Sequence, residues 1–268
     1  MSYKLLPLDL DGTLLMRDHT IPTEVKAAIT KLMDAGIIVT LSTGRMYPTV
    51  QKYALELGLK APLICYNGAL IRDAAGNPPL LDSPLPMDLQ MEIIRCGEAN
   101  GWYLQLYQND HVAAAEVVRE TLADPDSKTL PPVALGKLSE ATLQRSPKMM
   151  SMCAPEEVPV RMKAFSEATG NRLYIASSTP TLVEMMQKGV CKSEALKVLC
   201  AHYGIAREEV IVCGDSGNDA DMVAWAGLGC AMANATPALK ELADYICEES
   251  RSYGVLEVIR RYFPEESA

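Results

Sequence analysis

The chain of 268 residues lacks several features that would assign it to a special class of protein. It has no run of Lys or Arg, and its formal charge is −9, from 25 basic and 34 acidic residues. Because such a chain repels nucleic acid and anionic membranes, we expect neither as a partner. No apolar stretch approaches the length of a membrane span, and the residues before Asp9 do not resemble a signal peptide.

Closely spaced cysteine pairs are also missing. The eight cysteines are scattered, none forms a Cys-x-x-Cys pair, and several lie in apolar runs such as residues 210–213. This pattern predicts buried, reduced thiols and a reducing compartment, here the cytoplasm. With 49% hydrophobic and 22% charged residues, the composition is typical of a soluble globular protein. An anionic substrate would need local positive charge, which a divalent metal could supply.

The hydrophobic pattern of the first part of the chain alternates between strands and helices. We expect strands at residues 5–10, 37–41 and 63–66, and helices at 22–35 and 47–57. This alternation is typical of a parallel sheet with crossover helices. Pro7 is unusual in the first strand, because proline cannot donate to a sheet hydrogen bond and is rare in central strands.

A less regular middle part separates this region from a second alternating region. The middle part predicts helices at 87–100 and 155–169 and strands at 102–107, 173–177 and 182–186. After Gly189 we expect helices at 192–203, 219–226, 239–243 and 253–262, and strands at 209–213 and 229–232. The predicted fold is therefore α/β, with a Rossmann-like parallel-sheet core and an inserted α+β cap domain. The core would comprise residues 1–83 and 187–268, and the cap residues 84–186.

Polar clusters follow three of the predicted core strands. They are Asp9-Leu10-Asp11-Gly12-Thr13, Ser42-Thr43-Gly44-Arg45 and Gly214-Asp215-Ser216-Gly217-Asn218-Asp219. Ligands of open α/β sheets bind at the carboxyl ends of the strands. Asp9, Thr43 and Asp215 should therefore converge at one edge of the sheet.

The first cluster places two carboxylates two residues apart. Their mutual repulsion is costly unless a cation or a proton offsets it, and a hard metal ion suits ligands that are all oxygen. One carboxylate could then act as a nucleophile while the other moves a proton. The alternative is an ordinary Asp-Gly turn in which Asp11 is solvated.

The other polar groups also have a functional and a structural interpretation. Thr43 and Gly44 could offer a hydroxyl and an N–H to phosphate, or Thr43 could cap the following helix. The Asp215 cluster could bind metal, or it could be a turn with a helix cap; Ala220 and Ala226 exclude an EF-hand loop. Lys192, at a helix start where a cation is unfavourable, should face an anion unless it is a surface lysine.

Taken together and in order, these clusters resemble the motifs of the haloacid dehalogenase superfamily of phosphatases. Asp9-Leu10-Asp11-Gly12-Thr13-Leu14 is similar to the first motif, Thr43 to the second, Lys192 to the third and Gly214–Asp219 to the fourth. The cap-sized insert between the second and third motifs is similar to that of the Cof-type subfamily. The resemblance covers nearly the whole chain.

This resemblance implies a magnesium-dependent phosphatase of small phosphorylated metabolites. Asp9 would be the nucleophile, Asp11 would protonate the leaving oxygen and then activate water, and Lys192 would neutralise the phosphoryl group. The implied metal ligands are Asp9, Asp11 through its backbone carbonyl, Asp215 and, in support, Asp219. The implied phosphate contacts are Leu10, Thr43, Gly44, Lys192 and Asn218. Charge neutralisation of this kind is the main requirement of phosphoryl transfer.

Other functions remain possible on the same residues. A phosphomutase would use the same aspartates, and a catalytically silent phosphosugar-binding protein would keep the fold. A dehalogenase needs no second Asp, and a response-regulator receiver lacks so long an insert. The cap should set the substrate, with sugar phosphates favoured. Its candidate residues are Trp102, Tyr103, Tyr107, Arg119, Arg145, Lys148 and Met150. The sequence does not indicate the oligomeric state.

Overall fold

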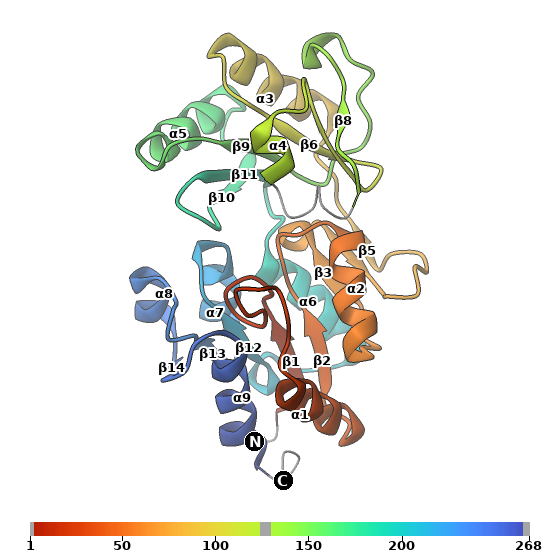
Figure 1. The fold of residues 1–268 in the computed structure, drawn as a ribbon, viewed down its shortest axis with the longest axis vertical. Coiled ribbons are helices and arrows are strands. Elements are labelled where there is room, and N and C mark those ends of the chain that lie inside the picture. The colour runs from red at the N-terminus through yellow and green to blue at the C-terminus, as the bar shows by residue number, and fades with distance from the viewer. Residues whose placement is uncertain (1–2, 124–129, 265–268) are drawn as a thin grey trace.

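In the computed structural model, which describes residues 3–123 and 130–264, a five-stranded parallel sheet forms the lower part of the molecule (Figure 1). The strands, in spatial order, are β14 (Tyr245–Ile246), β13 (Leu228–Ala231), β12 (Ile211–Gly214), β1 (Leu5–Leu8) and β2 (Ile38–Leu41). Each neighbouring pair is parallel. The predicted parallel-sheet core is therefore confirmed.

Helices cover both faces of this sheet. They are α1 (Thr23–Asp34), α2 (Tyr47–Leu57), α6 (Lys192–Tyr203), α7 (Ala220–Trp225), α8 (Pro237–Leu242) and α9 (Arg251–Tyr262). Leu6 and Leu8 of β1 share one apolar cluster with residues of α1, α2 and α9. Leu5, on the opposite face, belongs to a second cluster with residues of α6, α7 and α8. This alternation along β1 follows the period of two that a strand imposes on its side chains.

Pro7 lies in the central strand β1 despite its missing N–H. The strand keeps hydrogen bonds on both edges just beyond it, because Ser42 N–H donates to the Leu8 carbonyl and Asp9 N–H donates to the Cys213 carbonyl, at 2.8 and 3.1 Å. Opposite Pro7, the partner in β2 is Thr40. Pro7 therefore does not disturb the end of β1 or the position of Asp9.

The predicted third core strand lies beside the end of β2, as expected, but it also begins a second sheet that was not expected. β3 (Leu63–Cys65) pairs with β4 (Leu70–Arg72), which pairs with β5 (Leu81–Asp82), in a small antiparallel sheet. One parallel bridge, between Ser42 and Ile64, joins it to the end of β2. The sequence pattern cannot show this, because a short apolar run predicts a buried strand but not its partner.

The upper part of the molecule is a six-stranded sheet with helices on it (Figure 1). Its strands, in spatial order, are β10 (Leu173–Ala176), β11 (Leu182–Gln187), β9 (Met149–Met152), β6 (Gln105–Gln108), β7 (His111–Ala114) and β8 (Val133–Ala134). The helices are α3 (Met87–Ala99), α4 (Arg119–Ala123) and α5 (Val158–Ala168). All strand pairs are antiparallel except β7 with β8. The predicted α+β insert is confirmed, although β7, β8 and β9 were not expected; its exact boundaries remain a prediction.

The cysteines and the helices agree with the sequence analysis in two further respects. All eight cysteines are free thiols, and six of them are buried. Within residues 3–123 and 130–264, no helix combines the length and the apolar character needed to cross a bilayer.

Candidate active site

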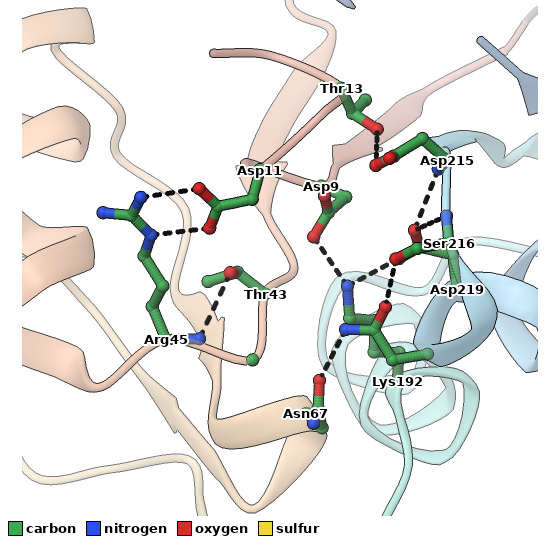
Figure 2. A network of polar contacts seen from close by, with 12 residues as sticks. Asp9, Asp11, Thr13, Thr43, Arg45, Asn67, Lys192, Asp215, Ser216 and Asp219 are labelled. Carbon is green, nitrogen blue, oxygen red and sulfur yellow. Dashed lines mark hydrogen bonds and ion pairs between the residues drawn. The ribbon is translucent and has the colours of Figure 1, made fainter. Parts of the chain in front are cut away.

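The carboxyl ends of β1, β2 and β12 bring the three polar clusters together, as predicted. Asp9 follows β1, Thr43 follows β2, and Asp215 follows β12. Figure 2 shows them around one centre, with Lys192 reaching in from the start of α6. Asp11 is half exposed next to a turn at Gly12, as the Asp-Gly turn interpretation expected, whereas Asp9 of the same cluster is buried at the shared centre.

Lys192 is the cation at this centre and contacts two of its carboxylates. Its Nζ donates to Asp9 Oδ1 at 2.7 Å and to Asp219 Oδ1 at 2.6 Å, and the residue is fully buried. Ser193 N–H donates to Asp221 Oδ2 of α7 at 2.6 Å, which anchors the first turn of α6. Lys192 faces carboxylates, so the interpretation as a surface lysine is wrong.

The carboxylates around Lys192 are hard to ionise together. Burial raises the pKa of Asp9 well above its usual range; Asp219 raises this pKa further, and Lys192 offsets only part of the rise. Burial, and then Asp219, raise the pKa of Asp215 to about 7. Burial opposes the charge of Lys192, but Asp219 and Asp9 outweigh it and raise the pKa of Lys192. One lysine is therefore not enough positive charge for the cluster.

These carboxylates fit a divalent cation. Ligand oxygens of Asp9, Asp215 and Asp219 lie within 4.8 Å of one another. Asp219 Oδ1 accepts from Lys192, and its Oδ2 accepts from the N–H groups of Asp215 and Ser216, at 2.9 and 3.1 Å. Because both its oxygens are already engaged, Asp219 is better suited to support the site, whereas Asp9 and Asp215 could ligate directly. A set of oxygen donors with excess negative charge suits a hard cation such as Mg²⁺.

The turn after β1 is shaped so that Asp215 can approach it. Thr13 Oγ1 donates to Asp215 Oδ1 at 3.0 Å, and Asn234 Nδ2 donates to the Gly12 carbonyl at 2.9 Å. Gly12 has a φ of +86°, and a Cβ there would overlap the Asp215 carboxylate. Glycine is therefore required at position 12 both by the backbone conformation and by the neighbouring carboxylate.

We expect Gly12→Ala to lower kcat/KM at least about 100-fold, because the new methyl group must displace the Asp215 carboxylate and small misplacements are costly in catalysis. Gly36→Ala is the matched control, since Gly36 has a similar φ of +90° but no atom within 4 Å of the point that a Cβ would occupy. It should lose about 1 kcal/mol of stability from backbone strain and keep its activity. Urea unfolding and steady-state assays of both variants test this; equal activities would contradict it.

Asp11 is held away from Lys192 by an arginine of the second cluster. Arg45 Nε and Nη2 each donate to the Asp11 carboxylate at 2.6 Å (Figure 2). Arg45 is buried, whereas the side chain of Asp11 is 50% exposed. This bidentate pair fixes the orientation of Asp11 at the mouth of the site. The sequence analysis placed both residues in motifs but did not predict their pairing.

Of the groups predicted to hold phosphate, Thr43, Gly44 and Asn218 line the same cavity as Asp9. Thr43 Oγ1 accepts from Arg45 N–H at 3.2 Å, so Thr43 is not the cap of α2, whose N-cap is Met46. The Leu10 side chain is in the apolar core, which leaves only its backbone for a ligand. The turn-and-cap interpretation of the third cluster is partly right, because Asp219 Oδ2 accepts from the Ser216 N–H at the start of the 3-10 turn Gly217–Asp219.

Asn67 is a site residue that the sequence analysis missed. Its Oδ1 accepts from Asn218 Nδ2 at 3.0 Å, and its N–H donates to the Thr43 carbonyl at 2.9 Å. It is buried with a φ of +55°, in a short 3-10 turn after β3. Asn67 therefore orients Asn218 and the loop of Thr43. The signal available was Asn67-Gly68 directly after a predicted strand, which is typical of many turns.

A cavity of about 590 Å³ opens above these groups. It is lined from the sheet side by Asp9, Asp11, Thr43, Gly44, Asp215 and Asn218. Of the predicted cap candidates, Tyr107, Lys148 and Met150 line it. The other four candidates do not line it. Trp102 packs on Phe165, the Tyr103 hydroxyl donates a hydrogen bond to Gln105, and Arg145 forms an ion pair with Asp82. Arg119 is exposed. The cavity thus lies between the parallel sheet and the cap sheet.

Comparison with known proteins gives consistent matches over the length of the chain. Residues 6–259 match the model of the haloacid dehalogenase-like hydrolases. Two Bacillus subtilis relatives are named 5-amino-6-(5-phospho-D-ribitylamino)uracil phosphatases. One, YitU, is 29% identical, with 97% of each chain covered. The other, YcsE, is 31% identical, with 98% of this chain and 96% of the relative covered.

Solved structures give the same result for the fold. A haloacid dehalogenase-like hydrolase from B. subtilis superposes with a TM-score of 0.85 and 26% sequence identity, covering 96% of this chain and 99% of that one. The match includes both the parallel sheet and the cap, since nearly all of each chain is aligned.

Proposed function

The chain belongs to the haloacid dehalogenase-like hydrolase family, and we propose that it is a magnesium-dependent phosphatase acting through an aspartyl-phosphate on Asp9. The named relatives are phosphatases of this family. The observation that carries the proposal is the convergence of Asp9, Lys192, Asp215 and Asp219 beneath one cavity. We propose residues 84–186 as the cap domain and the remainder as the catalytic core.

The first half of the reaction uses the groups at the end of β1. An oxygen of Asp9 attacks phosphorus, the bond to the leaving oxygen breaks, and Asp11 supplies the proton that the leaving alcohol takes. For this step Asp11 must leave Arg45, which binds both of its carboxylate oxygens, and must carry a proton; the proton that it takes from water in the second half serves the next turnover. Lys192 keeps its contact with Asp9 and reduces the repulsion between the carboxylate and the phosphoryl group.

The second half returns Asp9 to its starting state. Asp11 accepts a proton from water, which attacks the phosphorus of the acyl phosphate and releases inorganic phosphate. Thr43, the Gly44 N–H and Asn218 hold the phosphoryl oxygens, with Asn67 fixing the Asn218 amide. A bound Mg²⁺ supplies the further positive charge that a carboxylate needs to approach a phosphate dianion.

We propose small phosphorylated metabolites as substrates, with sugar phosphates and related polyol phosphates favoured. The cavity is of a size that suits a small molecule. The two named relatives act on a compound whose phosphate is carried by a ribityl chain, which is a polyol. A phosphomutase would use the same groups, but it would return the phosphoryl group to an alcohol and release no inorganic phosphate.

We expect phosphate release from a panel of sugar and polyol phosphates to require a divalent cation. Treatment with EDTA should abolish the activity, and Mg²⁺ should restore it, because the buried carboxylates otherwise resist joint ionisation. The measurement is colorimetric phosphate release with EDTA, Mg²⁺ or Ca²⁺. Full activity in EDTA would refute the metal dependence. Transfer between sugar positions without release would instead establish the mutase.

A further inference from the structure

A buried ion pair of the cap lies over the phosphate-binding end of the cavity. Lys148 precedes β9, and Glu184 lies in the neighbouring strand β11. Lys148 Nζ donates to Glu184 Oε1 at 2.7 Å, and the two residues are 4% and 2% exposed. Both line the cavity. Sequence reasoning included Lys148 among the cap candidates but missed Glu184, because one Glu in a strand pattern carries no distinguishing signal.

This pair is placed directly against the predicted phosphate site. Lys148 Nζ also donates to the Gly44 carbonyl at 2.7 Å. A Cβ added to Gly44 would lie 3.2 Å from Glu184 Oε1, so the carboxylate is packed against the backbone that would hold phosphate. The ring of Tyr107 flanks the ammonium group, with its centroid 4.7 Å from Nζ. The leaving group of a bound phosphate ester would therefore emerge beside Lys148 and Glu184.

Packing alone does not account for these charges. A buried ion pair is often no more stabilising than an apolar pair of similar size. Burial opposes ionisation of Glu184, but Lys148, followed by the Ser178 hydroxyl, outweighs it and lowers the pKa of the carboxyl group. The Ser178 hydroxyl lies near the carboxylate, but no hydrogen bond of good geometry reaches the buried Glu184 Oε2 among the described residues. A carboxylate with spare acceptor capacity beside a ligand cavity is suited to accept a hydrogen bond from a bound molecule.

We propose that Glu184 and Lys148 determine specificity by binding a hydroxyl group of the leaving alcohol. Glu184 Oε2 accepts the hydroxyl proton in a hydrogen bond, and Lys148 donates to a neighbouring oxygen. A leaving group without hydroxyls leaves the carboxylate unpaired, and sites built around such a hydrogen bond discriminate strongly against the analogue that lacks it. The inference rests on the proposed phosphatase function and narrows its substrates to polyol and sugar phosphates.

The test compares ribitol 5-phosphate with n-pentyl phosphate, which has the same number of carbons and no free hydroxyl. We expect the wild-type kcat/KM to favour ribitol 5-phosphate at least about tenfold. Glu184→Gln should lower that ratio about 10- to 100-fold, the range expected for a lost hydrogen bond to a charged group. The control is Glu157→Gln, which breaks an ion pair of the cap with Arg161, outside the residues that line the cavity, and should leave the ratio unchanged.

A double variant tests the same inference if the Glu184→Gln variant fails to fold. Replacing both Lys148 and Glu184 by Met leaves no unpaired buried charge, so the cap should fold, and the preference for ribitol 5-phosphate should still be lost. A ratio that stays at the wild-type value in either variant, or a wild-type enzyme without preference, overturns the inference. If the wild type releases no phosphate from any ester, the proposed function itself fails.

Discussion

Asp9→Asn is expected to lower kcat by more than about 10⁴-fold, the order of loss seen when an enzyme loses its nucleophile. Asn keeps the shape of the side chain but is a poor nucleophile for phosphorus. Because Asp9 is buried beside Lys192 and faces the cavity, no other described carboxylate has an equivalent position. Steady-state phosphate release with Mg²⁺ measures the effect. Asp34→Asn, an exposed charge deletion at the end of α1, is the control and should keep full activity.

The same variant should not lose stability when divalent cations are absent. Burial and Asp219 raise the pKa of Asp9, so the folded state disfavours its charge. A carboxyl group with a raised pKa in the fold contributes stability at low pH and loses that contribution as pH rises through the raised pKa. Asp9→Asn should therefore be at least as stable as wild type at pH 8 in EDTA, with a smaller difference at pH 5. Thermal unfolding at both values measures this; a variant that is less stable at pH 8 would contradict the account.

Lys192→Met is expected to abolish activity and to lower the free energy of unfolding by about 3 to 5 kcal/mol at neutral pH. Removing one partner of a buried charge network leaves the other charges uncompensated. Lys192 is fully buried and contacts Asp9 and Asp219, so its loss leaves both carboxylates without their cationic partner. Urea unfolding with matched activity assays measures both effects.

The control for this variant lies on the same helix. Lys197→Met removes an exposed lysine of α6 whose partner is Glu194, and it should change stability by less than about 1 kcal/mol. Because Asp9→Asn and Lys192→Met are both inactive but differ in stability, the pair separates loss of chemistry from loss of the fold. A stable Lys192→Met variant would show that the buried charges are compensated in another way.

The sequence predicted the site residues whose positions follow from the order of strands and helices along the chain. Asp9, Thr43 and Asp215 each follow a strand of the pattern, and the carboxyl ends of parallel strands necessarily meet at one edge. The helix that presents Lys192 was expected at residues 192–203, and α6 has those bounds. The antiparallel pairing of β3 with β4 could not be predicted, because a short apolar run does not show which strand it pairs with.

Side-chain contacts between segments that are distant in the sequence could not be predicted either. Asn67 meets Asn218 across 151 positions, and Lys148 meets Glu184 across two strands of the cap. Such side chains are common in turns and strands, and only the packed structure shows that these ones are buried against the cavity. Asp11 and Arg45 were both in recognised motifs, yet their pairing depends on the orientation of two loops.

The central claim is that the phosphoryl group passes through a covalent bond to Asp9. The direct measurement is acid quenching of the Mg²⁺-loaded enzyme during turnover of a sugar phosphate, followed by mass spectrometry of the peptide that contains Asp9. We predict one added phosphoryl group on Asp9 in the wild-type enzyme and none in Asp9→Asn. Rapid phosphate release with the phosphoryl group found on another residue, or sustained turnover by Asp9→Asn, would contradict the account.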